Sequence, residues 1–302
     1  MAARFAAVAH GRLSVVHIEP PEAFDPVVAS QRVPVRVSLG ETGDPAQKLV
    51  TEQARRVDGD PVLLRGGSLA ATACAWAAHE SADLLVAAAH RGFVARATLG
   101  SFAAYLAHHA PCTSLFVRPN HDGPRPEAAQ HIACCVDDSP AARGALAEAS
   151  LLADALQARL SVLHVEAVPF AIPLSWSEPP EEDFFTAAQR RVAALAATFE
   201  NATPTPIFGF GYPPALTCEW AKENDVDLLM AAAHRGLAAR IYLGSFTSYL
   251  AYHAPCSVLV TRRQVAHTLG EDLTHTGHGA DEPAGADDIP GEAADPTGAG
   301  SR

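Results

Sequence analysis

The chain has 302 residues, of which 48% are hydrophobic and 19% charged, and its formal net charge is −12. This composition is typical of globular protein, and the length suffices for two domains that each bury a core. The acidic balance argues against a nucleic-acid partner, because no basic stripe is available to displace phosphate counterions. No apolar run of about 18 residues and no signal-peptide pattern occurs, so we expect a cytoplasmic protein without a membrane partner.

The chain contains an internal duplication. His90-Arg91-Gly92 recurs 144 positions later as His234-Arg235-Gly236, and Leu99-Gly100-Ser101-Phe102 recurs at the same offset as Leu243-Gly244-Ser245-Phe246. The upstream halves align at an offset of 147, where residues 12–19 match residues 159–166. A period this long indicates two copies of a whole domain rather than a solenoid of small units.

The first copy is predicted to lack its first strand. The second copy opens with an apolar strand near residue 131, and the offset of 147 carries its counterpart to a position before residue 1. Residue 1 therefore falls inside what we expect to be the first helix of repeat 1. Two explanations stay open: the true start lies upstream, or repeat 1 serves as a structural partner of repeat 2. In either case we expect any nucleotide site of this chain to lie in repeat 2.

Repeat 2 alternates short apolar runs with segments of helical periodicity, which indicates a parallel sheet with crossover helices. The predicted strands cover residues 132–136, 160–165, 206–210, 227–233 and 257–261. The predicted helices cover residues 141–156, 181–199, 215–223 and 244–253. The fold class is therefore α/β, with two doubly wound parallel-sheet domains in tandem.

Composition sets the domain boundaries. A polar segment rich in proline and glycine begins at Arg118 and predicts the linker between the repeats, and an acidic segment rich in Gly, Pro, Asp and Ala predicts a disordered tail. We expect repeat 1 at 1–119, the linker at 120–130, repeat 2 at 131–263 and the tail at 264–302. The six cysteines form no C-x-x-C pair, and we expect buried reduced thiols rather than a metal site or disulfides.

Several motifs of the two repeats resemble the universal stress protein family. They are Val136-Asp137-x-Ser139 after the first strand, Leu243-Gly244-Ser245 at the start of a helix, and His253-Ala254-Pro255-Cys256 before the last strand. The resemblance implies flavodoxin-like domains of the adenine-nucleotide-binding type, with strand order 3-2-1-4-5 and, in one branch, ATP between strands 1 and 4. It also implies dimer-like packing through the last strands. In this chain we expect residues 257–261 to pair with residues 115–118, which would make the two repeats an intramolecular pseudo-dimer, and a homodimer stays open.

The resemblance implies a nucleotide site in repeat 2. Its candidate residues are Asp137, Val165, Ala232, His234, Arg235, Gly236, Gly244 and Ser245. In the family the phosphates lie in a loop written G-x2-G-x9-G-S/T, whose glycines let the backbone approach the ligand. This chain has alanine at the first glycine position, Ala232 or Ala233, and seven rather than nine residues between the next two glycines. We expect ATP, accompanied by Mg²⁺, to fit this shortened loop less well.

Each candidate residue also has a structural interpretation. Asp137 either accepts hydrogen bonds from the base and ribose or caps the following helix, a role open to Asp138 and Ser139 as well. Val165 contacts adenine or packs in the core, and Arg235 binds phosphate or is a solvated loop charge. His164 lies within a strand and is expected to be a hydrogen-bonded core histidine.

The function predicted from the sequence is an ATP-binding sensor in the stress response. The alternative is a ligand-free interaction module of the same fold that acts through protein partners. An enzyme is the weaker hypothesis, although slow ATP hydrolysis stays open: the first turn, Asp137-Asp138-Ser139-Pro140, has no glycine for a phosphate loop, and no nucleophile–base pair is found.

Overall fold

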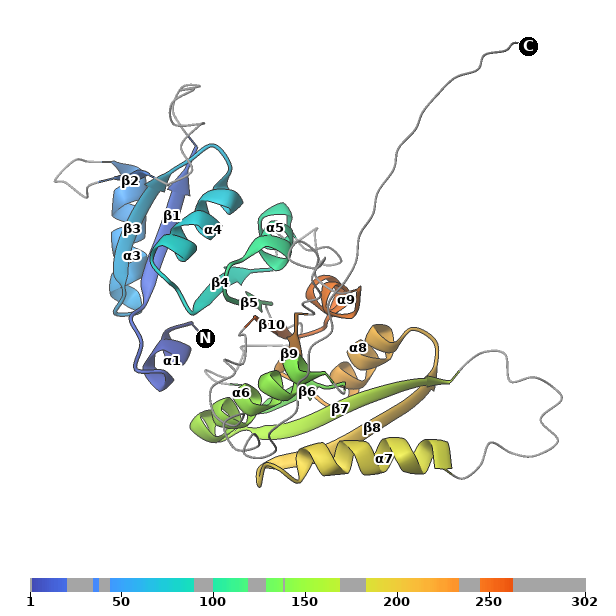
Figure 1. Ribbon diagram of the computed structural model, residues 1–302. Coiled ribbons are helices and arrows are strands. Elements are labelled where there is room, and N and C mark those ends of the chain that lie inside the picture. Colours follow the sequence, from blue (N-terminus) through green and yellow to red (C-terminus); the bar gives the residue numbers. More distant parts are fainter. Residues whose placement is uncertain are drawn as a thin grey trace, which may run out of the picture. The chain divides into compact units, whose positions relative to one another are not determined.

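The computed structural model describes residues 2–20, 35–37, 44–89, 100–118, 129–137, 139–168, 183–233 and 245–262 (Figure 1). The described residues belong to one compact unit, Met1–Val265, and the expected tail lies outside the described residues. Among the described residues, no helix has the length and apolar character needed to cross a membrane.

A seven-stranded sheet contains all of repeat 2 and the end of repeat 1. Its order is β4-β5-β10-β9-β6-β7-β8. The strands are β4 (Leu84–Ala88), β5 (Thr113–Val117), β6 (His131–Cys135), β7 (Arg159–Val168), β8 (Ala202–Phe210), β9 (Leu228–Ala232) and β10 (Ser257–Thr261). The five strands of repeat 2, read as β8-β7-β6-β9-β10, have the expected order 3-2-1-4-5 and pair in parallel. The predicted flavodoxin-like α/β fold is confirmed.

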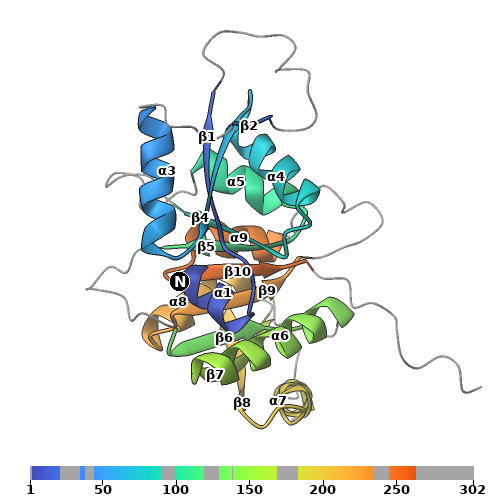
Figure 2. The same cartoon turned by 90° about the vertical axis from the view of Figure 1, so that its left-hand side faces the viewer.

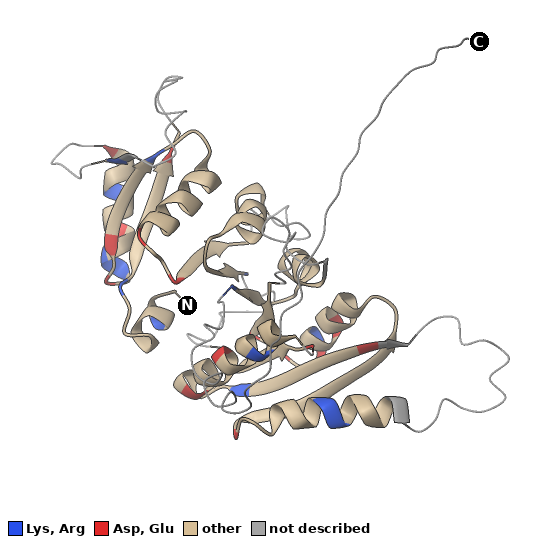
Figure 3. Ribbon diagram, viewed as in Figure 1, with Lys and Arg blue, Asp and Glu red and all other residues tan. Residues whose placement is uncertain are grey.

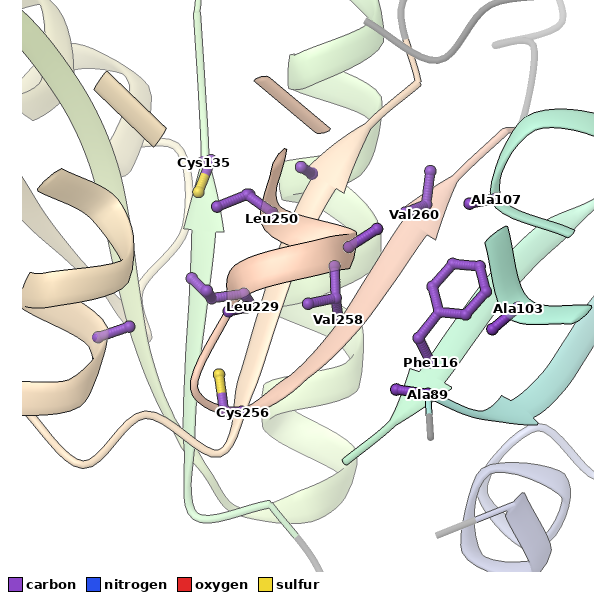
Figure 4. Packing of buried hydrophobic residues seen from close by; sticks show 14 of the residues in the cluster. Ala89, Ala103, Ala107, Phe116, Cys135, Leu229, Leu250, Cys256, Val258 and Val260 are labelled. Carbon is purple, nitrogen blue, oxygen red and sulfur yellow. The ribbon is translucent and has the colours of Figure 1, made fainter. Parts of the chain in front are cut away.

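The helices of repeat 2 cover both faces of this sheet. They are α6 (Pro140–Leu156), α7 (Asp183–Ala196), α8 (Pro213–Glu223) and α9 (Ser245–His253). One core cluster joins Cys134 of β6 to residues of α6 and α7, and the other joins Cys135 to residues of α8 and α9. Neighbouring strand residues point to opposite faces, so α6 and α9 lie on opposite sides of β6 and β9. Figure 4 shows the second cluster around β10, with Leu229, Leu250 and Val258 packed together.

The two repeats join where β5 and β10 pair antiparallel, with Phe116 opposite Val258 and Leu115 opposite Leu259. All other described pairings in this sheet are parallel. The pairing brings together the segments that the family resemblance placed side by side. β5 and β10 are equivalent strands of the two repeats. Because they pair antiparallel, a contact from repeat 1 to repeat 2 should recur, with the two repeats exchanged, between the residues at the 144-residue offset.

Two arginines make such a duplicated contact. The Arg118 guanidinium donates a hydrogen bond to the Ala251 carbonyl in α9, and that of Arg262 donates to the Ala107 carbonyl in α5 (Ser101–His109). Within a regular helix these carbonyls would accept from the residue four positions later, which is Pro255 or Pro111 and has no N–H. Each repeat therefore caps a helix end of the other.

Arg118 is the residue at which the composition placed the start of the linker. It is 5% exposed, and its backbone N–H donates to Ser257 Oγ at 3.1 Å, as that of Arg262 donates to Thr113 Oγ1 at 3.3 Å. Arg118 therefore belongs to the buried seam between the repeats.

Repeat 1 contributes a separate three-stranded sheet of order β1-β3-β2, formed by β1 (Ser14–Glu19), β3 (Asp60–Arg65) and β2 (Val35–Val37). β1 and β3 are parallel and β2 is antiparallel. The helices α3 (Pro45–Arg56) and α4 (Leu69–His79) accompany them, and α3 packs along β1 and β3 (Figure 2). The helix α1 (Ala2–Val8) instead contacts α6. Charges of both signs lie together on α3 (Figure 3), where Glu52 and Arg56 form an exposed ion pair.

Repeat 1 follows the pattern of repeat 2 apart from its central strand. His10 lies two residues after α1 and has φ 49°. Its counterpart at the offset of 147 is Gln157 at the end of α6, which has φ 55°. In repeat 2 the strand β6 lies between β7 and β9. Among the described residues, no strand lies between β1 and β4, which are the counterparts of β7 and β9. Each of these two strands is therefore an edge.

Candidate functional site

At the carboxyl edge of the repeat 2 sheet, the neighbouring strands β6 and β9 lead to connections that diverge. The chain leaves β6 for α6 on one face and leaves β9 for α9 on the other. Ligands of open parallel sheets bind at such a switch point. At this edge Cys135, the last residue of β6, pairs with Leu163 of β7 and Ala231 of β9.

This register places three candidate positions next to one another. Two residues beyond Cys135, Asp137 lies level with Val165 of β7 and with Ala233, and Ala232 lies one level below. Asp137 and Val165 are half-buried, and Ala233 is 7% exposed. The structure therefore brings Asp137, Val165 and Ala232 together at the end of the sheet.

The turn after β6 distinguishes the two roles considered for Asp137. Ser139 is the N-cap of α6, and its Oγ accepts a hydrogen bond from the Ala142 N–H at 3.1 Å. Asp137 Oδ1 accepts from the Ser139 N–H at 2.9 Å, which is an Asx turn that shapes the loop. Helix capping is therefore the role of Ser139, and Asp137 orients the turn that follows β6. Asp138 lies outside the described residues.

His164 fixes the residue that precedes Asp137. Its Nδ1 lies 2.9 Å from the Val136 carbonyl oxygen. Its Nε2 lies 2.9 Å from Glu166 Oε1, and the same oxygen accepts from Arg191 of α7 at 3.3 Å. His164 is the hydrogen-bonded strand histidine that we expected, and it also ties β7 to the end of β6.

Thr247 fixes the start of α9 against the end of β9. Its Oγ1 donates to the Ala232 carbonyl at 3.0 Å, and the residue is 2% exposed. The N-terminus of α9, which begins at Ser245, is thereby held at the carboxyl edge of the sheet. Sequence reasoning missed Thr247. The signal was a threonine inside the first turn of a helix, at a position where repeat 1 has Ala103.

Four other candidates, His234, Arg235, Gly236 and Gly244, lie outside the described residues, and of Ser245 only the backbone is described. Repeat 1 shows the end of the equivalent loop. Gly100, the counterpart of Gly244, is the N-cap of α5 with φ −61°, and its N–H donates to the Ala89 carbonyl at 3.0 Å. Gly100, at the start of α5, therefore lies beside Ala89, the residue that follows β4.

Burial keeps the thiols of Cys74, Cys112, Cys134 and Cys218 protonated at neutral pH. Burial raises the pKa of Cys134 and of Cys218 to about 12, and it raises those of Cys74 and Cys112 to about 11. A thiol in this state is a weak nucleophile and a poor metal ligand. Within the described ranges, no group of three or more His, Cys, Asp or Glu side chains is placed to hold a metal ion.

Comparisons with known proteins agree with the fold. The model of the universal stress protein family matches residues 1–118 and again residues 128–262. A solved universal stress protein of Pseudomonas aeruginosa UCBPP-PA14 is similar with 16% identity and a TM-score of 0.62, covering 86% of each chain. One from Archaeoglobus fulgidus DSM 4304 has 16% identity and a TM-score of 0.61, covering 87% of this chain and 92% of its own. No curated protein matches the sequence. At this identity the solved structures show the fold alone.

Proposed function

The chain belongs to the universal stress protein family, and we propose that it is a sensor that binds ATP at the carboxyl edge of repeat 2. It acts in the stress response through conformation and contacts rather than through catalysis. The observation that carries this proposal is the placement of Asp137 level with Val165 at the carboxyl ends of β6 and β7, beside the switch point between β6 and β9.

The side chains at this edge of the sheet suit an adenine nucleoside with a phosphate chain. The Asp137 carboxylate accepts hydrogen bonds from ribose hydroxyls or from the exocyclic amine of the base. Val165 offers a half-buried apolar contact for the ring on the face where Leu163 packs. The N-terminus of α9 supplies amide donors and positive partial charge for phosphate, and Thr247 keeps it in place. Mg²⁺ enters with the nucleotide.

One nucleotide per chain is the expected stoichiometry. The described part of repeat 1 contains no counterpart of β6 or of Asp137. A ligand there would lack the central strand and the carboxylate, so repeat 1 acts as the structural partner that covers β10.

Isothermal titration calorimetry with Mg-ATP tests the proposal. Asp137→Asn removes the negative charge and keeps the shape, and we expect it to weaken binding about 10- to 100-fold, as is typical for loss of a charged hydrogen-bond partner. Asp58→Asn is the matched control: Asp58 is exposed in repeat 1 with φ 52°, a conformation that asparagine tolerates. Its affinity should equal that of the parent.

Two results would contradict the proposal. An unchanged affinity for Mg-ATP in Asp137→Asn would show that the nucleotide does not bind beside Asp137 at the ends of β6 and β9. No heat of binding, together with no thermal stabilisation by Mg-ATP, would favour the ligand-free interaction module, because any ligand of the native state raises its stability.

A further inference from the structure

The first turn of α8 departs from the pattern of the duplication. In repeat 1, Ser68 is the N-cap of α4, and its Oγ accepts a hydrogen bond from the Ala71 N–H at 3.5 Å. The counterpart of Ser68 at the offset of 144 is Tyr212, the N-cap of α8, whose side chain makes no capping hydrogen bond. A capping serine of repeat 1 is therefore replaced by a large aromatic ring in the repeat that holds the candidate site.

The helix α8 does not need a side-chain cap at this position. Pro213 and Pro214 occupy its first two positions, and proline has no N–H group to satisfy. The next two donors, the N–H groups of Ala215 and Leu216, both bond to the Tyr212 carbonyl oxygen, at 2.9 and 3.2 Å. The side chain at position 212 is thus released from the role that serine has in repeat 1.

Tyr212 lies at the carboxyl edge of the sheet. Leu216, in the first turn of α8, packs against Gly209 of β8, where an added Cβ would meet the leucine side chain at 3.0 Å. Gly211 has φ 129°, a conformation that favours glycine. The chain therefore turns sharply from β8 into α8, and Tyr212 stands beside the carboxyl end of β8.

The Tyr212 ring is 48% exposed, although it is large and aromatic. It meets the Tyr249 ring of α9 edge to face, with 5.2 Å between centroids, and Tyr249 in turn lies 4.2 Å from the His253 ring. Repeat 1 has the same pair in Tyr105 and His109, whose centroids are also 4.2 Å apart. Repeat 2 therefore adds a third, half-exposed ring to a pair that both repeats share.

Tyr212 and the candidate contact for adenine belong to the same face of the sheet. Val165 of β7 is level with Ile207 of β8, and both are half-buried. Val165 has the orientation of Leu163, which packs in the cluster formed with α8 and α9, and Ile207 packs against the same cluster. These two aliphatic side chains therefore lie on the face that α8 covers, and Tyr212 marks the end of α8 at the carboxyl edge.

We propose that Tyr212 binds the nucleobase and makes repeat 2 selective for purine nucleotides. The inference rests on the proposed nucleotide site and adds the residue that recognises the ring. The base lies between the aliphatic side chains of Val165 and Ile207 and the exposed part of the Tyr212 ring. Stacking on an aromatic side chain strengthens binding about 5- to 150-fold per base. A purine covers more apolar area than a pyrimidine, so ATP should bind more tightly than CTP.

Three substitutions of Tyr212 test this role in calorimetric titrations of the full chain with Mg-ATP and Mg-CTP. Tyr212→Ser introduces the residue of repeat 1, which is favourable at an N-cap, so the variant should fold as the parent does. It should bind Mg-ATP about 5- to 150-fold more weakly, and its preference for ATP over CTP should be smaller. Tyr212→Phe keeps the ring and should bind as the parent does. Tyr212→Leu is apolar without a π-face and should resemble Tyr212→Ser. Thermal unfolding without ligand verifies that each variant is folded.

Phe185→Ser is the matched control. Phe185 is also an exposed aromatic residue, but it lies on α7 at the opposite face of the sheet, so its loss should leave the affinity for Mg-ATP unchanged. Equal affinities of Tyr212→Ser and the parent, together with weaker binding by Asp137→Asn, would overturn the role of Tyr212 and leave the nucleotide site in place. An equal loss for Mg-ATP and Mg-CTP in Tyr212→Ser would overturn the selectivity for purines. Absence of Mg-ATP binding by the parent would overturn both proposals.

Discussion

The crossed arginines make a quantitative prediction about the seam between the repeats. Replacing Arg118 with alanine removes the guanidinium that caps the Ala251 carbonyl, and no N–H of its own helix is available to that carbonyl because Pro255 follows. The backbone hydrogen bond to Ser257 stays. The substitution therefore isolates the side chain.

Two costs add in Arg118→Ala. Loss of a hydrogen bond to a charged donor costs about 1.5–3 kcal/mol when the acceptor stays buried. Removal of a long stem that is 5% exposed leaves unfilled space, which adds on the order of 1 kcal/mol. We expect the free energy of unfolding to fall by about 2–4 kcal/mol, and by about half as much in Arg262→Ala, because Arg262 is only half-buried.

Urea denaturation followed by circular dichroism measures these differences. Arg143→Ala is the control, since Arg143 is exposed on α6, and it should change stability by less than about 0.5 kcal/mol. The reasoning fails if Arg118→Ala behaves like this control, or if Arg262→Ala is the more damaging of the two seam substitutions.

Two further predictions concern single buried side chains. Burial lowers the pKa of His131, so the unfolded chain binds the extra proton more tightly and stability should fall as the pH drops below about 6.5. Urea midpoints between pH 5 and 8 should therefore vary less in His131→Gln than in the parent, and equal slopes would exclude His131 as a cause. Thr247→Val removes the hydrogen bond to the Ala232 carbonyl and should cost about 1–2 kcal/mol. Thermal unfolding checks this against Thr205→Val, whose hydroxyl bonds within its own exposed strand, and equal losses would argue against a special role for Thr247.

The local signals in the sequence were sufficient for most of the fold. Short apolar runs predicted each strand of repeat 2, and helical periodicity predicted its helices. The strand predicted at residues 257–261 has the same first and last residues as β10. The strand expected at 160–165 extends in the structure to Val168, because it pairs along its whole length with β8 up to Phe210. A cross-strand pairing of this kind leaves no mark in the periodicity of either strand alone.

The remaining features depend on neighbours that are distant in sequence. The sequence predicted Arg118 as the first residue of a polar linker. Its side chain is buried because it donates to the Ala251 carbonyl, which has no helical N–H partner since Pro255, 137 positions after Arg118, lacks one. Thr247 acts through the end of β9, which lies 15 positions earlier in the sequence. Of the candidate site, Asp137, Val165 and Ala232 lie together, and their role in binding stays a prediction.

The central claim is that the chain carries one adenine-nucleotide site and that it lies in repeat 2. Native mass spectrometry of the purified protein, before and after addition of Mg-ATP, measures this directly. We predict a single added mass of one nucleotide per chain, absent in Asp137→Ala. Two nucleotides per chain, or one that persists in Asp137→Ala, would contradict the account.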